Sequence, residues 1–121
     1  VELWGKLLLS PLTRRLVAKF GKDNVGDEQY TSAGKRIDVV VRRGEKKFWF
    51  YEIKTSASPR ACLREALGQV LEYSYWPGST EPDRIIVCGE CPLDDEGGSY
   101  LRKLRKKFKL PVAYQQIVLD A

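Results

Sequence analysis

Apolar and polar residues follow two different spacings along the chain, and each spacing predicts one kind of element. Valines fill the centre of 36–42 and aromatic residues fill much of 47–55, so both segments are expected to be strands. The segment between them contains Gly44, which favours a turn, and the two strands are expected to form a hairpin. The second strand is apolar on both faces until Glu52, as is typical of a central strand that is covered on both sides.

Helical spacing of apolar residues marks the other long segments. Ser58-Pro59 combines an N-cap residue with a proline at the first helical position, and Ser10-Pro11 repeats this signature. Each pair is therefore expected to begin a helix, and the helix at Ser10 is expected to follow a separate helical turn. The expected helical segments are 2–9, 10–20, 59–75 and 98–109.

Three more strands are expected outside these segments, of which the first is a weak signal and the second is a short apolar run. They are expected at 28–32, as an edge strand, and at 84–89 and 111–119. A helix separates the strands at 47–55 and 84–89, which suits a crossover between parallel strands. The expected fold class is therefore α/β, a central mixed β-sheet flanked by helices, in a single domain that spans 1–121.

The absence of histidine excludes more chemistry than any other feature of the composition. Neither a Ser-His-Asp triad nor a zinc site with histidine ligands can form in this chain. The three cysteines, Cys62, Cys88 and Cys91, are too few for a closed zinc site, and their odd number favours a reducing, cytoplasmic setting. No apolar run approaches the length of a membrane span, and because the chain starts at Val1, an origin within a larger protein stays open.

Positive charge exceeds negative charge, with 21 Lys and Arg against 16 Asp and Glu and a formal net charge of +5. This balance modestly favours an anionic partner. The densest basic segment is 102–109, which is either a solvated helix face or a patch that contacts phosphates. The candidate nucleic-acid-binding residues are Arg60, Arg64, Arg102, Lys103, Arg105 and Lys106.

Two charged residues interrupt the apolar central strand near its end. Glu52 and Lys54 are two residues apart and so share a face, and Asp38 lies in a similar apolar setting on the partner strand. A loop made of residues 44–46 would place Asp38 directly opposite Glu52. A two-residue loop would instead place it opposite Tyr51, facing away from Glu52. A site that uses both carboxylates therefore requires an odd-length or bulged turn.

Directly opposed carboxylates repel each other, so such a pair makes sense mainly with a cation between its members. Asp38 and Glu52 offer the oxygen ligands that Mg²⁺ or Mn²⁺ prefers, and the backbone carbonyl of Ile53 is a further candidate ligand. Lys54 would lie beside a metal-bound water, where it would help to deprotonate that water or neutralise developing charge. This chemistry suits in-line attack on a phosphodiester.

The pattern resembles the PD-(D/E)xK nuclease superfamily, which includes restriction endonucleases and Holliday-junction resolvases. In the helix that follows the carboxylates, Gln69 and Tyr73 look like the Q-x-x-x-Y element that several branches place beside the active site. Glu2 is the best-placed candidate for the glutamate that the family often has in its first helix, and Ile37 stands where the motif name has proline. The matching stretches are Arg-Ile-Asp-Val-Val-Val at 36–41, Tyr-Glu-Ile-Lys-Thr at 51–55 and Gly-Gln-Val-Leu-Glu-Tyr at 68–73.

The resemblance implies a restriction-endonuclease-like core and a metal-dependent nuclease, with DNA endonuclease activity favoured over action on RNA. Many relatives act as homodimers. Two alternatives stay open: a catalytically inactive nuclease-fold module that binds nucleic acid or a partner protein, and a domain of a larger defence or mobile-element protein whose other parts choose the target. The implied catalytic residues are Asp38, Glu52, Lys54, Gln69 and Tyr73, and the implied metal ligands are Asp38, Glu52, the Ile53 carbonyl and Glu2.

Overall fold

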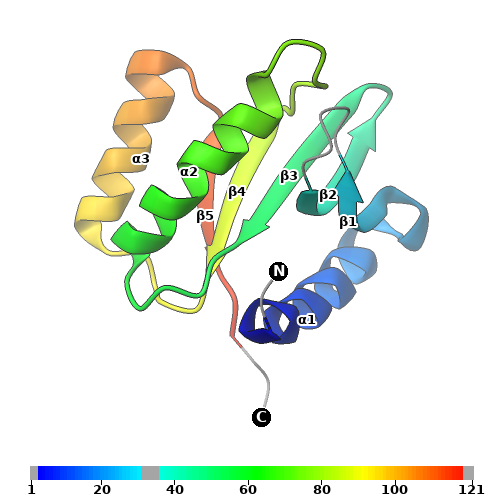
Figure 1. The fold of residues 1–121 in the computed structure, drawn as a ribbon, viewed down its shortest axis with the longest axis horizontal. Helices are drawn as coiled ribbons and strands as arrows, with labels where there is room; N and C mark the ends of the chain where they lie inside the picture. Colours follow the sequence, from blue (N-terminus) through cyan, green and yellow to red (C-terminus); the bar gives the residue numbers. More distant parts are fainter. Residues whose placement is uncertain (1–2, 31–35, 119–121) are drawn as a thin grey trace.

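The computed structural model of this chain describes residues 3–30 and 36–118 (Figure 1). Three strands follow the first helix, and helices and strands alternate afterwards, which is the pattern of a hairpin region followed by crossover units. In chain order the elements are α1 (Leu3–Phe20), the 3₁₀ helix η1 (Lys22–Asn24), β1 (Val25–Tyr30), β2 (Arg36–Gly44), β3 (Lys47–Ile53), α2 (Pro59–Tyr75), β4 (Arg84–Gly89), α3 (Asp95–Phe108) and β5 (Val112–Gln116).

The five strands of the described residues form one mixed sheet in the order β1-β2-β3-β4-β5. The strands β1, β2 and β3 pair in antiparallel fashion, whereas β3, β4 and β5 run parallel. The strand β3 is therefore central, as its two apolar faces predicted, and α2 and α3 provide the crossovers between the parallel strands. The predicted α/β class, with a mixed sheet flanked by helices, is confirmed.

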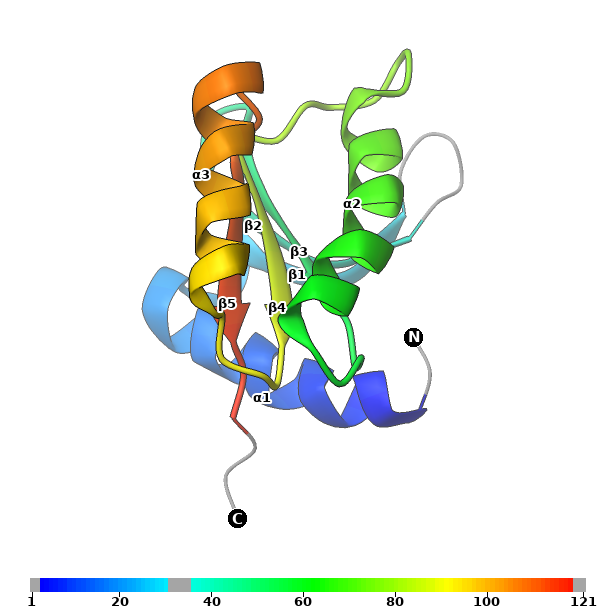
Figure 2. The same cartoon turned by 90° about the vertical axis from the view of Figure 1, so that its left-hand side faces the viewer.

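Helices cover both faces of this sheet, and α1 lies apart from α2 and α3 in both views (Figures 1 and 2). The helix α1 packs on one face, where Leu12 and Leu16 join a buried cluster that includes Tyr51. The helices α2 and α3 pack on the other face and contribute Leu63 and Leu101 to a second cluster. None of the described helices is both long enough and apolar enough to cross a membrane.

The helix α1 is continuous, so the predicted break at Ser10-Pro11 is wrong. Pro11 lies inside the helix and lacks the N–H that would bond to the carbonyl four residues earlier, which costs about 3 kcal/mol or more. Leu9, Leu12 and Leu16 lie on both sides of this proline and are buried against the sheet. Their packing offsets the missing hydrogen bond, because each buried leucine contributes roughly 1.5–3 kcal/mol.

Two other predicted boundaries are shifted in the structure. The helix α3 begins at Asp95 and not at 98, because Asp94 caps it: the Asp94 Oδ1 atom accepts a hydrogen bond from the Gly97 N–H at 2.7 Å. The edge strand β1 begins at Val25, before the predicted 28–32, because its first residue already pairs with β2. Residues 31 and 32 of that prediction lie outside the described residues.

The helix α2 begins and ends where its sequence signals predicted. The Ser58 Oγ atom accepts a hydrogen bond from the Ala61 N–H at 3.1 Å, and Pro59 occupies the first turn. The helix ends at Tyr75, one residue before the Trp76-Pro77-Gly78 stretch. These bounds set which residues of α2 face the sheet and which face solvent.

The β2–β3 hairpin contains the bulge that a two-carboxylate site requires. Its turn has two residues, which alone would direct Asp38 away from Glu52. A register shift between Arg42 and Gly44, however, makes Arg43 an extra residue in β2. The rest of the ladder moves by one residue, and Asp38 comes to lie opposite Glu52, one step beyond the last backbone pair. The prediction of a bulged turn is confirmed.

Candidate functional site

Asp38 and Glu52 are buried together on the face of the sheet that α2 covers. Both residues are 5% exposed, and they alternate with Val39 and Tyr51, which belong to the cluster on the α1 face. The Ile53 N–H donates to Asp38 Oδ2 at 2.8 Å. This bond forms beyond the last backbone pair of the hairpin, so the Asp38 side chain links β2 to β3 after their ladder ends.

Glu52 is the less satisfied of the two carboxylates. Its Oε1 atom is buried and has no hydrogen-bond partner among the described residues. Burial and then the charge of Asp38 raise the pKa of Glu52 from the ordinary 4.5 to about 8. Burial also raises the pKa of Asp38, although the hydrogen bond from the Ile53 N–H opposes this shift. Without a cation, the pair therefore holds a proton near neutral pH.

Lys54 lies at the end of β3 and is held by a residue of α2. Its Nζ atom donates to Gln69 Oε1 at 2.6 Å, and its positive charge lowers the pKa of both Asp38 and Glu52. Tyr73 lies one helical turn beyond Gln69, and its pKa is raised by burial and then by the charges of Glu52 and Asp38. The structure thus brings the five residues of the predicted catalytic set into one neighbourhood.

Arg36 belongs to the same neighbourhood, although no motif pointed to it. Its charge lowers the pKa of Asp38 and of Tyr73, and its Nη1 atom lies 3.7 Å from Glu28 Oε1. Strand alternation was the available signal, because Arg36 precedes Asp38 by two residues and so shares its face. A cation here partly balances the negative charge of the buried pair.

The donor chemistry of the site fits a divalent metal that prefers oxygen ligands. Two carboxylates converge, and Glu52 offers a buried oxygen that lacks a partner among the described residues. The Ile53 N–H points toward β2, and because the N–H and C=O of a strand residue point toward the same neighbour, its carbonyl is directed to that side as well. In the described part of the chain no third carboxylate or thiolate joins the pair, and Glu2 lies outside the described residues.

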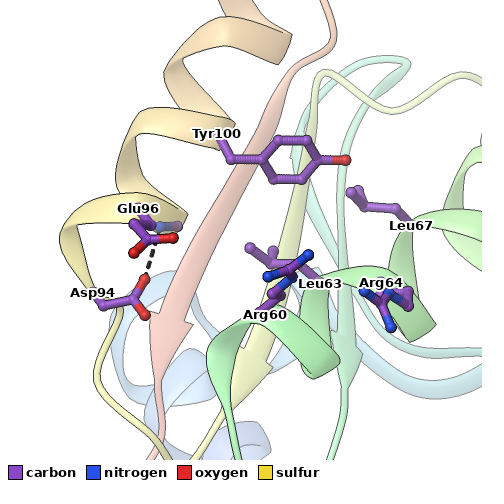
Figure 3. A pocket seen from close by; sticks show the side chains of 8 residues that line it. Arg60, Leu63, Arg64, Leu67, Asp94, Glu96 and Tyr100 are labelled. Carbon is purple, nitrogen blue, oxygen red and sulfur yellow. Dashed lines mark hydrogen bonds between the residues drawn. The ribbon is translucent and has the colours of Figure 1, made fainter.

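Arg60 and Arg64, two predicted nucleic-acid-binding residues, lie elsewhere. They line a groove of about 550 Å³ between α2 and α3, with Tyr100 on the α3 side (Figure 3). Two carboxylates, Asp94 and Glu96, belong to the same lining, which makes the groove mixed in charge. These two arginines therefore lie on α2, as the sequence predicted, on the side that faces α3.

The other predicted basic residues follow the exposed surface of α3. Arg105 uses its Nη1 atom to donate to the Val112 carbonyl at 2.7 Å, so part of its role is to attach the helix to β5. The helix packs beside β5, whereas the carboxylate pair lies between β2 and β3. The four predicted residues, all of them exposed, are Arg102, Lys103, Arg105 and Lys106.

Cys88 and Cys91, which are three positions apart in a C-x-x-C sequence, have different surroundings. Cys88 is fully buried in the cluster on the α1 face, and burial raises the pKa of its thiol. Cys91 is partly exposed, and its Sγ atom lies 2.9 Å from the Ala57 carbonyl oxygen, to which it donates. Their placement gives each thiol a separate packing role.

Comparisons with protein-family models, with curated proteins and with solved structures give no match for this chain. Function is therefore inferred from the chemistry of the site itself. That chemistry consists of a buried carboxylate pair, an adjacent lysine held by a glutamine, and a tyrosine and an arginine within the electrostatic reach of the pair.

Proposed function

We propose that this chain is a metal-dependent nuclease that hydrolyses phosphodiester bonds, with DNA as the favoured substrate. The observation that supports this most strongly is the Glu52 Oε1 atom, which is buried beside Asp38 without a partner among the described residues. Burying a carboxylate oxygen without a partner costs free energy that a purely structural pair would not recover. Coordination of Mg²⁺ or Mn²⁺ would satisfy this oxygen and remove the repulsion within the pair.

Each residue of the site has a separate part in this proposal. Asp38, Glu52 and the Ile53 carbonyl would hold the metal, which when bound would activate water and neutralise charge on the phosphate. Lys54 donates to a phosphate oxygen as negative charge develops there, and Gln69 keeps its ammonium group in place. The Tyr73 phenol, whose pKa is raised further above its ordinary 10, stays protonated at neutral pH and can donate a hydrogen bond to the substrate.

The topology supports assignment to the PD-(D/E)xK type. The carboxylates lie on adjacent antiparallel strands, the next helix supplies Gln69 and Tyr73, and β4 then pairs parallel to β3. This sequence of elements is what a restriction-endonuclease-like core would require around such a site. We therefore include that core and its catalytic set in the proposal.

The proposal is tested by incubating the protein with supercoiled plasmid, single-stranded DNA and RNA in the presence of Mg²⁺ or Mn²⁺. We expect metal-dependent cleavage of DNA that EDTA abolishes and that the Asp38→Ala and Glu52→Ala variants lose. Lys47→Ala is the matched control, because Lys47 is exposed on the same strand outside the site. Gel electrophoresis of the products over time measures the rate.

Two results would contradict the proposal. Cleavage that persists in both carboxylate variants would show that the activity arises elsewhere. An absence of cleavage on every substrate would favour a catalytically inactive module that binds nucleic acid or a partner protein. Preferential cleavage of RNA would retain the site but change the substrate.

Gln69→Ala is expected to slow cleavage about 10–100-fold, because a hydrogen bond that involves a charged group contributes roughly 1.5–3 kcal/mol. The single-turnover rate should fall while the affinity for DNA stays within a few-fold. Gly68→Ala is the control on the same helix, since a Cβ at this exposed position would meet nothing within 4 Å. Equal rates for Gln69→Ala and the wild type would show that Lys54 needs no partner.

A further inference from the structure

A cluster of cations lies at the end of β2, whereas the carboxylate pair lies near the start of that strand. A cavity of about 360 Å³ is present where the end of α1 meets the β2–β3 hairpin. Three of the residues that line it are cations, and the lining includes no carboxylate among the described residues. A concave surface of one charge sign favours an ion of the opposite sign. The lining residues are Lys19, Phe20, Asn24, Arg42, Arg43 and Gly44.

Aromatic rings hold the Arg43 guanidinium in this cavity. Its central carbon lies 4.5 Å from the centroid of the Phe20 ring and 4.7 Å from that of Trp49. The two rings pack edge to face, with centroids 5.8 Å apart. Lys19 and Arg84 complete the stack, with Lys19 Nζ 5.2 Å from the Phe20 centroid and Arg84 5.1 Å from the Trp49 centroid. The cations are thus preorganised before a ligand arrives.

Arg42 is held by a different contact. Its Nε atom donates to Asn24 Oδ1 at 3.3 Å, and the Asn24 Nδ2 atom donates to the Phe20 carbonyl at 2.8 Å. A guanidinium has five N–H donors, so this one hydrogen bond still leaves donors for a ligand. Two oriented guanidinium groups beside one cavity match the several acceptor oxygens of a phosphate.

The bulge connects this cavity to the carboxylate pair. The residue that it inserts is Arg43, and the same insertion brings Asp38 opposite Glu52. Arg42 lies four positions beyond Asp38, which is about 13 Å along a strand at ~3.3 Å per residue. Phe20 and Trp49 pack on the α1 face of the sheet, whereas Asp38 and Glu52 lie on the α2 face, so the cavity is a contact separate from the carboxylate site.

We propose that this cavity binds a backbone phosphate of nucleic acid and forms a second contact with the substrate away from the carboxylates. The assignment of nucleic acid as the ligand rests on the proposed nuclease function, whereas the anion site rests on the cavity itself. The contact would be independent of base sequence, because phosphate oxygens are the same at every step. Asp23 and Glu45 lie on adjoining segments but outside the lining, so they limit the local positive potential without filling the cavity.

The test measures binding of a short fluorescently labelled DNA duplex by anisotropy in EDTA, over a series of salt concentrations. The Arg42→Gln/Arg43→Gln variant is expected to bind about tenfold more weakly. Its log–log salt slope should fall by about 0.9 for each phosphate contact that is lost. The matched control is Arg14→Gln/Arg15→Gln, which removes two exposed arginines of α1 outside the cavity.

Lys19→Gln and Arg43→Lys extend the test if the double variant does not fold, as judged by circular dichroism. Lys19→Gln should weaken binding about threefold. It should also lower the log–log salt slope by about 0.9, the value for one phosphate contact. Arg43→Lys keeps the charge but loses the planar donor set, so a smaller loss of affinity is expected. Equal losses in the cavity variant and the Arg14/Arg15 control would show diffuse electrostatic attraction and overturn the proposal. So would unchanged binding in the cavity variants.

The binding assay and the cleavage assay can fail separately. A wild-type protein that binds DNA through this cavity but never cleaves it would retain the phosphate site and contradict the nuclease. A wild-type protein that cleaves DNA while the Arg42→Gln/Arg43→Gln variant binds normally would retain the nuclease and contradict the phosphate site.

Discussion

Replacing Lys54 with methionine is expected to lower the rate of Mg²⁺-dependent DNA cleavage by about 10²–10³-fold, the usual effect of removing one donor to a developing oxyanion. Lys54 is the cation beside Asp38 and Glu52, and its Nζ atom is directed by Gln69 at 2.6 Å. Methionine retains most of the apolar stem and removes the charge. The single-turnover rate at saturating protein measures the effect on the chemical step.

Lys47→Met is the control for this substitution, because it removes the same charge from an exposed position on the same strand. Its cleavage rate should stay within about twofold of the wild type, since an isolated surface charge contributes little. The Lys54→Met variant should still bind Mg²⁺, which a titration followed by calorimetry can establish. A Lys54→Met variant that cleaves at the wild-type rate would assign the oxyanion contact to another residue.

Replacing Glu52 with glutamine is expected to stabilise the metal-free protein at pH 8 by roughly 2–4 kcal/mol relative to the wild type. The pKa of Glu52 is about 8 in the folded protein and ordinarily 4.5, so the folded state binds this proton more tightly than the unfolded chain. The resulting stability is fully present below pH 4.5 and is lost as the pH rises toward 8. Glutamine cannot ionise, and the variant avoids this loss.

The measurement is the free energy of urea unfolding in EDTA at several values between pH 5 and pH 8. The wild type should become less stable across this range, whereas the Glu52→Gln variant should change far less. Glu45→Gln serves as the control, because Glu45 is exposed at the tip of the hairpin. A wild-type profile that is flat over this pH range would show that Glu52 is not a strained carboxylate.

At pH 8, Mg²⁺ is expected to make the wild type more stable than the Glu52→Gln variant, which is the reverse of their order in EDTA. A ligand that binds only the folded state stabilises it by RT ln(1 + [L]/Kd), and the ionised Asp38–Glu52 pair is the proposed ligand set. Saturating Mg²⁺ should therefore stabilise the wild type and leave Glu52→Gln nearly unchanged. Equal stabilisation of both proteins by Mg²⁺ would place the metal elsewhere.

The sequence by itself determined the elements whose signals are local. Ser58 and Pro59 marked the start of α2, and the cap contact that they predict is present. The two apolar faces of β3 predicted its central position, and the pairing of β3 with both β2 and β4 confirms it. These features follow from neighbouring residues, because capping, helical spacing and strand alternation depend on positions only a few residues apart.

Short-range patterns in the sequence also determined part of the candidate site. Alternation along β3 placed Glu52 and Lys54 on one face, and helical spacing placed Gln69 and Tyr73 on one side of α2. The need for a bulged hairpin followed from the assumption that Asp38 meets Glu52. The sequence could not show which residue the bulge inserts, because Arg43 is held by Phe20 of α1 and by Trp49 of β3.

Only the tertiary structure decided which groups are buried and which have partners. Pro11 predicted a helix break, but packing of Leu12 and Leu16 against the sheet keeps α1 continuous. The Lys54–Gln69 contact and the unpartnered, buried Glu52 Oε1 atom depend on how α2 covers β3. Desolvation and hydrogen bonding are set by residues far apart in the chain, so the strain of the carboxylate pair becomes visible only when the layers are assembled.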